Sequence, residues 1–265
     1  MKVVVAGGFN KDFQQDIYDC NIPKLYSILN EKKPILEYDD NYFLIVDSGA
    51  HTWNKNSITK VGHKSKRKLK PAIEFIEYYY HFIKEHRHKK FIFIEFDTYG
   101  DLSKEIIDSY YYKIKEMDMT AKFIRVYHPI LDNGNLDTIR KWIDEGQDYI
   151  CIANDSLGLL DGIFNLTQDK IKVHGLAITK LPLMERYPFF SVDSTSPLST
   201  VMFGRYSKPI MNFNERKDIA KIKSIECFHE NQERLRNALI ETKKTQEYCT
   251  NLWIKKGIRW EDIKW

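Results

Sequence analysis

Polar residues recur in this sequence directly after short apolar runs. The residues concerned are Asp47, Asp97, His128, Asn154 and Asp193. If the apolar runs are parallel β-strands, these side chains stand at the carboxyl ends of the strands, where barrel enzymes carry their catalytic groups. A single aspartate in such a place more often caps the next helix. Several carboxylates at one rim carry an electrostatic cost, and that cost indicates a chemical use.

Paired carboxylates are suited to chemistry at a sugar. A glycosidic carbon passes through an oxocarbenium-like state, which one carboxylate stabilises or captures while a second carboxyl moves a proton on or off the leaving group. The pattern therefore predicts glycosyl transfer or hydrolysis at a nitrogen or an oxygen, and it does not choose among them.

A cluster of basic residues follows Asp47. Its members are Lys60, His63, Lys64, Lys66, Arg67, Lys68 and Lys70. Because the cluster follows the end of a strand, we expect it to project from the catalytic face and to bind the phosphates of a polyanionic substrate. The alternative is a solvated charge run ahead of a helix. A second basic run, at 86–90, precedes a strand, so we expect it on the opposite face.

The apolar runs predict eight strands with helices between them. The strands are expected at 2–6, 42–46, 91–96, 123–127, 149–153, 171–177, 189–192 and 200–203. The helices are expected at about 71–87, 102–118, 135–146, 156–168 and 180–186. Near-continuous apolar strands that alternate with helices are typical of a parallel sheet covered on both faces. We therefore expect an α/β fold, a single (β/α)8 TIM-type barrel, with a doubly wound open sheet as the alternative.

Length and composition fit one domain of this kind. The chain has 265 residues, of which 43% are hydrophobic, and it contains no linker rich in Pro, Gly or Ser. We expect a single domain over 1–265, with the barrel over about 1–213 and a charged helical extension over 214–265. The net charge of +4 is far from the excess of a protein that coats nucleic acid, so any contact with a polymer must be local.

Cysteine usage and hydropathy predict a cytoplasmic protein that binds no metal ion and no cofactor. No stretch approaches the ~20 apolar residues of a membrane span, and the first residues turn polar too soon for a secretory signal. We expect the cytoplasm, that of the host if a phage encodes the chain. The four cysteines show no CxxC or CxC spacing, which disfavours disulfides and a zinc knuckle. Cys227 and His229 could share a metal, but such pairs are usually just parts of a helix, so we expect no metal and no cofactor.

Four short motifs occur in one order between residues 42 and 205. They are Asp47-Ser48-Gly49-Ala50, Phe96-Asp97, His174-Gly175-Leu176-Ala177 and Val192-Asp193-Ser194-Thr195-Ser196. Together they resemble the motifs of the tRNA-guanine (queuine) transglycosylase superfamily, which are Asp-Ser-Gly-Gly, Phe-Asp, Gly-Gly-Leu-Ala and the segment of the nucleophilic aspartate. The phrases Asp-Ser-Gly-Ala and Ser-Val-Asp-Ser-Thr-Ser are most similar to the DpdA-type branch of phages and bacteria, which inserts 7-deazaguanine bases into DNA.

The resemblance implies a role for each matched residue. Asp193 would attack the anomeric carbon and expel guanine, while Asp47 would be the general acid/base for the leaving and incoming bases. Asp97 would accept hydrogen bonds from N1–H and the exocyclic amino group of a guanine-type base. His128 stands where the tRNA enzymes have a glutamine that reads the base carbonyl. The other residues that we expect at the base pocket are Ser48, Gly49, Asn154, Gly175 and Leu176.

The chain also departs from this family. It lacks the closely spaced cysteines of the zinc site that the tRNA enzymes carry near the C-terminus, which argues for a different polymer or docking mode. Ala50 and His174 each replace a glycine, so the pocket wall is expected to differ. We therefore expect a base-exchange transglycosylase whose partners are DNA, with the target nucleotide unstacked, and a free 7-deazaguanine base.

Three alternatives stay open at this point. They are the same exchange on tRNA, a nucleoside or sugar hydrolase that uses the same aspartates on a small substrate, and a barrel that binds nucleic acid without catalysis. The basic cluster disfavours the small substrate, and the intact pair of Asp47 and Asp193 disfavours a barrel without catalysis. No membrane partner is expected, and association as a homodimer or with a helper protein stays open.

Overall fold

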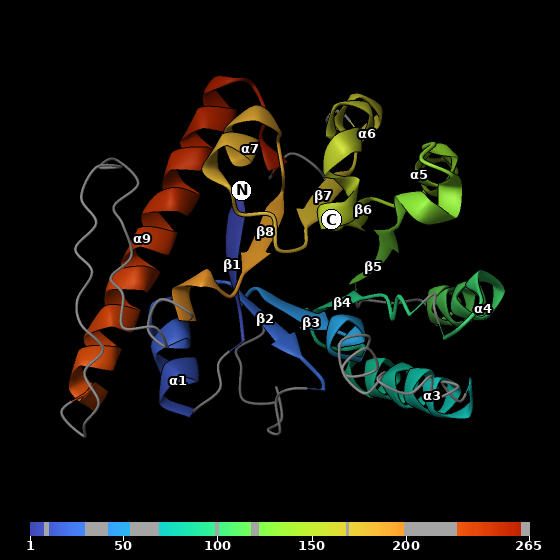
Figure 1. Ribbon diagram of the computed structural model, residues 1–265, viewed down its shortest axis with the longest axis horizontal. Helices are drawn as coiled ribbons and strands as arrows, with labels where there is room; N and C mark the ends of the chain where they lie inside the picture. Colours follow the sequence, from blue (N-terminus) through green and yellow to red (C-terminus); the bar gives the residue numbers. More distant parts are fainter. Residues whose placement is uncertain are drawn as a thin grey trace, which may run out of the picture. The chain divides into compact units, whose positions relative to one another are not determined.

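The fold is a closed barrel of eight parallel strands in the order β1 to β8, with helices around it (Figure 1). The computed structural model describes residues 1–7, 11–29, 42–53, 69–98, 101–117, 122–167, 170–198 and 227–260. The (β/α)8 architecture predicted from the sequence is confirmed, and the open sheet is excluded because β8 pairs directly with β1.

The bounds of the elements are as follows. The strands are β1 (Lys2–Ala6), β2 (Lys24–Ser27), β3 (Leu44–Asp47), β4 (Ile92–Ile94), β5 (Lys122–Tyr127), β6 (Tyr149–Ile152), β7 (Lys172–Gly175) and β8 (Ser191–Ser194). The helices are α1 (Lys11–Asp19), α3 (Leu69–His86), α4 (Lys104–Lys115), α5 (Asp137–Asp144), α6 (Leu160–Thr167), α7 (Leu181–Arg186) and α9 (Cys227–Lys255). Two 3-10 helices are η2 (Pro129–Asp132) and η3 (Asn154–Leu159).

The expected strand list is wrong in one place. It omits β2, whose sequence Lys-Leu-Tyr-Ser begins with a lysine that is nevertheless fully buried. The expected strand at 200–203 lies outside the described residues, and the barrel closes without it. The remaining expected strands each overlap an observed one, and the five expected helices correspond to α3, α4, α5, α6 and α7.

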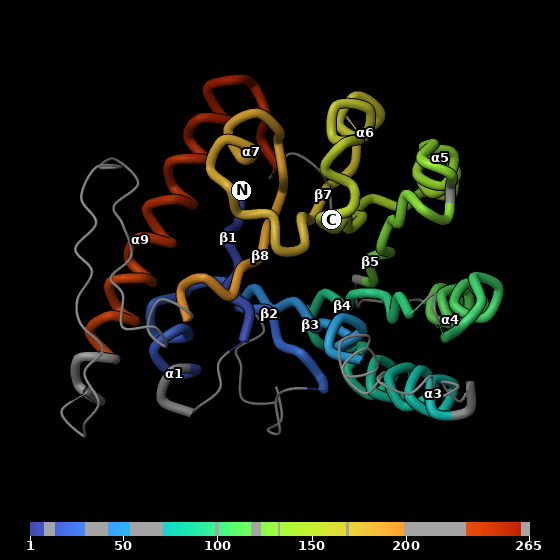
Figure 2. Tube along the Cα trace, in the orientation of Figure 1, coloured from blue at the N-terminus to red at the C-terminus, as the bar shows by residue number. Residues whose placement is uncertain are grey.

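The chain divides into two compact units, of which the first comprises Met1–Lys24 and Tyr127–Trp265. Figure 2 shows how segments far apart in the sequence lie side by side in it, as β1 does with β8. Parallel pairing continues from β8 to β7 and from β7 to β6. Helix α9, which supplies the predicted C-terminal helical extension, packs against β1, α1 and α7. That the whole chain forms one domain stays a prediction.

Strands β6, β7 and β8 of this first unit carry buried polar side chains on the face that is turned to the barrel interior. Val5 of β1 packs with buried apolar residues of α1 and α9, so the face that carries Val5 looks toward the helices. Side chains alternate along a strand, which puts Val4 and its register partner Asp193 on the opposite face. Register and alternation assign four further buried residues to this interior face: Tyr149, Lys172, His174 and Ser191.

The second unit, Leu25–Val126, contains β3, β4, most of β5, and helices α3 and α4. Strand β4 pairs in parallel with both β3 and β5. Helix α3 is anchored to the strands by Tyr79, whose hydroxyl group lies 2.8 Å from the carbonyl oxygen of Ile94 and 3.1 Å from that of Val46. Burial raises the pKa of Tyr79 well above its ordinary value, so the hydroxyl group keeps the proton that it donates.

Candidate functional site

Asp193 lies near the carboxyl end of β8, and its side chain is almost fully buried. Its Oδ1 accepts a hydrogen bond of 2.8 Å from the backbone N–H of Ala177. The same oxygen lies 3.4 Å from Nε2 of His174. Within the described residues, no hydrogen bond or ion pair engages Oδ2. A carboxylate with one oxygen held and the other available has the form of a positioned nucleophile.

The N–H group that holds Asp193 comes from a strained turn. Ala177 has a φ of 54°, in the left-handed region that residues other than glycine rarely adopt. Such a conformation costs roughly 1 kcal/mol or more and is often found at functional sites. The strain at Ala177 therefore marks the turn after β7 as a place where the backbone is shaped around the Asp193 carboxylate.

A chain of buried polar groups lies behind Asp193 on the interior face. Nδ1 of His174 lies 2.5 Å from Oγ of Ser191, and that hydroxyl group is also hydrogen-bonded to the hydroxyl group of Tyr149. His174 and Ser191 are fully buried. Burial raises the pKa of Tyr149, so its hydroxyl group stays protonated.

Sequence reasoning missed Ser191 and Tyr149 as parts of the site, and took His174 only as an altered pocket wall. A signal was present in β8, where Ser191 and Asp193 are polar residues two apart in an otherwise apolar run. That spacing puts both side chains on one face of a strand. The first residue of β6, Tyr149, carries no comparable signal.

Gly175 and Leu176, both expected at the base pocket, lie at the end of β7 and in the turn that follows it. Gly175 is buried, and a Cβ added there would lie 3.0 Å from the ring of Phe189 and 3.1 Å from Cβ of Ile178. The backbone N–H of Leu176 donates to the carbonyl oxygen of Ile152 at 2.8 Å and so extends the sheet.

His128 and Asn154 lie at the ends of β5 and β6. Nδ1 of His128 is 3.4 Å from Oδ2 of Asp155, which is the residue after Asn154. Both Asn154 and Asp155 are exposed at the start of η3. The structure therefore places His128 beside the residue that follows Asn154, and Asp155 is a contact of His128 that the sequence did not single out.

Asp47 ends β3 in the second unit and is held by a tight local turn. Its Oδ2 accepts a hydrogen bond of 3.0 Å from the backbone N–H of Gly49, an aspartate turn of the usual kind. Gly49 has a φ of 82°, and a Cβ there would meet the side chain of Leu29 at 2.7 Å, so glycine is required for two reasons. Ser48 is fully buried, and its hydroxyl group donates to the carbonyl oxygen of Glu95 at 3.0 Å. The three residues expected at this motif thus shape the backbone around the Asp47 carboxylate.

Asp97 follows β4 and is partly exposed. The residue before it, Phe96, is buried in an aromatic cluster with Phe75 and Trp53, at ring distances of 4.9 and 5.8 Å. These rings bury the residue before Asp97, whereas Asp97 itself is partly exposed.

A second carboxylate near this strand end has a structural role. Glu95 is buried and accepts hydrogen bonds from Nε of Arg125 and from the backbone N–H of Val126, each at 3.1 Å. Burial raises the pKa of Glu95, and the charge of Asp97 raises it further. The charge of Arg125 and the hydrogen bond from the Val126 N–H act in the opposite direction. Because both charges are buried and paired, Glu95 holds β4 to β5 and is not a candidate for catalysis.

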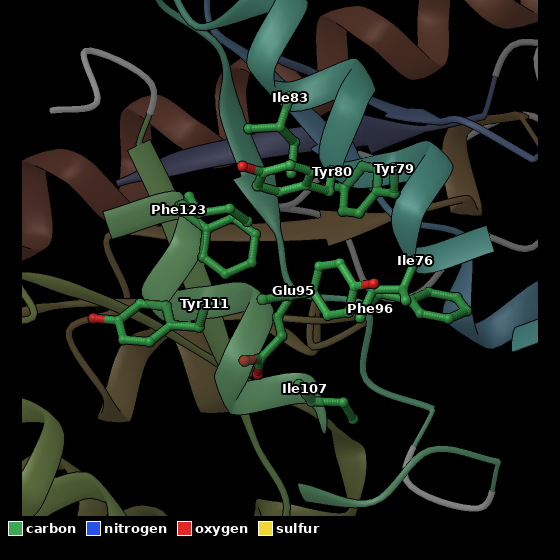
Figure 3. Close-up of a pocket in the computed structure, with 11 residues that line it drawn as sticks. Ile76, Tyr79, Tyr80, Ile83, Glu95, Phe96, Ile107, Tyr111 and Phe123 are labelled. Atoms are coloured by element: carbon green, nitrogen blue, oxygen red, sulfur yellow. The ribbon is translucent and has the colours of Figure 1, made fainter. Parts of the chain in front are cut away.

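Figure 3 shows a cavity beside Glu95, lined also by Tyr79 and Ile76 of α3 and by Tyr111 of α4. Its volume is about 10 Å³, which is the space of a single water molecule. The cavity lies between strands and helices on the side away from the barrel interior. It is a packing space and not a substrate site.

Most of the basic cluster lies outside the described residues. Lys60, His63, Lys64, Lys66, Arg67 and Lys68 lie outside the described residues, and Lys70 lies in the first turn of α3 with its side chain outside the description. Cys227 and His229 lie in the first turn of α9, and their side chains are also outside the described part of the structure. In the part of the chain that is described, no three His, Cys, Asp or Glu residues gather in a way that could hold a metal ion.

No family model matches the sequence, and no curated protein is similar enough to count as a relative. None of the helices in the described ranges has the length and apolar character needed to cross a membrane. The assignment of function therefore depends on the residues of this chain and on the motifs that they form.

Proposed function

We propose that the protein is a base-exchange transglycosylase that replaces guanine in DNA with a 7-deazaguanine base. The observation that carries the proposal is the carboxylate of Asp193, which is held by Oδ1 near the carboxyl end of a barrel strand while its Oδ2 has no hydrogen bond or ion pair among the described residues. Four segments of the chain resemble the motifs of the guanine transglycosylases and occur in the same order. They are those of Asp47, Asp97, His174-Gly175-Leu176-Ala177 and Asp193.

The proposed reaction consists of two displacements at C1′ of the target nucleotide. Oδ2 of Asp193 forms a bond to C1′ while the C1′–N9 bond breaks, and N9 of guanine takes the electron pair together with a proton from the carboxyl group of Asp47. The incoming base then returns a proton from its own N9 to Asp47 and attacks C1′, which releases Asp193 as a carboxylate. Two displacements retain the configuration at C1′.

Other residues support a base of guanine type and a DNA polymer. The partly exposed carboxylate of Asp97 can accept hydrogen bonds from N1–H and the exocyclic amino group, which guanine and its 7-deaza analogues share. His128, next to Asp155, offers a ring nitrogen to the base carbonyl. The segments Asp47-Ser48-Gly49-Ala50 and Ser191–Ser196 resemble the branch that modifies DNA, and this favours DNA over tRNA.

The proposal is tested by following labelled guanine into polymer. The wild-type protein is incubated with labelled guanine and either DNA or tRNA, and a parallel sample with unlabelled 7-deazaguanine base is analysed for base composition. We expect label in DNA and, on denaturing gels, a protein–DNA adduct. The substitution Asp193→Asn should lower exchange by roughly 10⁴-fold or more and abolish the adduct, because the nucleophile is lost.

The matched control is Asp161→Asn. Asp161 is an exposed aspartate of α6 that binds Arg186 and the hydroxyl group of Tyr187, so its loss should leave exchange unchanged. Label that enters tRNA but not DNA would overturn the choice of polymer. Label that enters neither polymer, or full exchange by the Asp193→Asn variant, would overturn the proposed function itself.

A further inference from the structure

The buried chain of Tyr149, Ser191 and His174 ends on the oxygen of Asp193 that does not attack. All three residues lie on the interior face of neighbouring strands β6, β7 and β8. His174 is fully buried, and among the described residues its Nε2 has no hydrogen-bond partner of good geometry. Oδ1 of Asp193 lies 3.4 Å from this Nε2.

The protons of this chain can be assigned from its geometry. If His174 carried its single proton on Nδ1, the bare Nε2 would face the carboxylate, and two acceptors would repel each other. If the proton is on Nε2, it points at Oδ1 of Asp193, while Nδ1 accepts from the hydroxyl group of Ser191. The Ser191 oxygen then accepts from Tyr149, whose hydroxyl group keeps its proton. This direction gives each donor along the chain an acceptor, and it avoids the repulsion between a bare Nε2 and the carboxylate.

We propose that His174 is a positioning residue, held as an Nε2–H donor by Ser191 and Tyr149, which fixes Oδ1 of Asp193 and makes Oδ2 the attacking oxygen. This inference rests on the proposed function for its reaction, but the arrangement of protons is a property of the protein alone. The backbone N–H of Ala177 is the second donor to the same oxygen.

The arrangement has a consequence for the second displacement. After Oδ2 has formed its bond to C1′, Oδ1 is the carbonyl oxygen of a glycosyl ester. When the incoming base attacks C1′, the C1′–Oδ2 bond breaks and negative charge returns to the carboxylate. Two donors already aimed at Oδ1 stabilise that charge as it develops, in the manner of an oxyanion hole. The contact of 3.4 Å fits a resting enzyme, because catalytic hydrogen bonds often shorten only in the complex.

The first test is spectroscopic and needs no substrate. The ring nitrogens are observed by NMR in protein labelled with ¹⁵N-histidine, and the signals of His174 are identified by their loss in the His174→Gln variant. We expect a proton on Nε2 of His174 at neutral pH. In the Ser191→Ala variant the preference for Nε2 should weaken, because Nδ1 loses its donor. A bare Nε2 in the wild-type protein, or no change in Ser191→Ala, would overturn the proposal.

The second test is kinetic and uses two substitutions of the same residue. His174→Leu removes the donor and should lower the rate of base exchange roughly 10- to 100-fold at saturating substrate, with KM nearly unchanged. His174→Gln keeps an N–H group near the position of Nε2 and should recover most of the rate. Equal losses in the two variants would show that the imidazole only fills space.

The control for lost volume is Val4→Ala. Val4 is buried and is the register partner of Asp193 on β1, but it has no polar group to offer. We expect folded Val4→Ala protein to exchange bases at the wild-type rate, and a loss as large as that of His174→Leu would overturn the positioning role. If the wild-type protein exchanged no base on any polymer, the proposed function would fail, and the NMR result would still decide whether His174 presents Nε2–H to Asp193.

Discussion

Glycines near the site show how one residue can serve the fold and the site together. Gly175 ends β7, directly after His174, and the resemblance to the guanine transglycosylases predicts that its backbone borders the base pocket. The structure supplies a packing reason for the missing side chain, because the ring of Phe189 and Cβ of Ile178 occupy the space that a Cβ would need. The absence of a side chain at Gly175 therefore does not by itself require a ligand.

We expect Gly175→Ala to destabilise the protein by about 1–3 kcal/mol, as overpacking of a buried site does. The added Cβ would lie 3.0 Å from Phe189, so the ring or the strand must shift. Gly158 of η3 is a matched control, since a Cβ there meets nothing within 4 Å and its backbone is not left-handed. Gly158→Ala should change stability by less than about 1 kcal/mol. Urea unfolding of both variants checks this, and equal midpoints would contradict the packing argument.

At the scale of the elements, helix α3 fixes the end of the strand that carries Asp47 and the end of the strand that precedes Asp97. Tyr79 reaches from α3 to the carbonyl oxygens of Val46 and Ile94, one residue before Asp47 and three before Asp97. Its hydroxyl group is the link by which the helix positions the strand ends, and the link is buried.

We expect Tyr79→Phe to cost about 1–3 kcal/mol of stability, because the hydroxyl group is lost and two buried carbonyl oxygens are left without this donor. The neighbouring Tyr78 is 55% exposed, so Tyr78→Phe is the control and should change stability by less than about 0.5 kcal/mol. Thermal or urea unfolding measures both variants. If the two substitutions had the same effect, Tyr79 would not be the anchor of α3.

The elements also show which features the sequence could predict. Long apolar runs such as FIFIEF identified the barrel, because parallel strands covered on both faces are apolar throughout. Strand β2 was missed because its first residue, Lys24, is a lysine whose burial only the closed barrel explains. Asp47 and Asp193 could be found because polar residues at strand ends stand out. The partnership of His174 with Ser191 could not, since it depends on the register between β7 and β8.

For the whole molecule, a buried lysine makes stability depend on pH in an unusual direction. Lys24 and Lys172 are the first residues of β2 and β7, and both are almost fully buried. Burial lowers the pKa of Lys172 from 10.5 to about 8, although Asp148 raises it. Between these two values the unfolded chain binds a proton that the folded protein does not. The contribution of Lys172 to the free energy of unfolding therefore increases as pH rises from about 8 to 10.5.

We expect Lys172→Met to be more stable than the wild-type protein at pH 7, by at most about 3 kcal/mol, because the buried charge is removed. The loss of the contact between Lys172 and the ring of Phe190, at 5.0 Å, subtracts from this gain. The gain should shrink as pH rises through 8, where the folded wild-type lysine becomes neutral. Urea unfolding at pH 7, 8 and 9 measures it, with the exposed Lys170 as the control in Lys170→Met. A gain that stayed constant over this range, or one shared by Lys170→Met, would show that the buried charge of Lys172 is not its source.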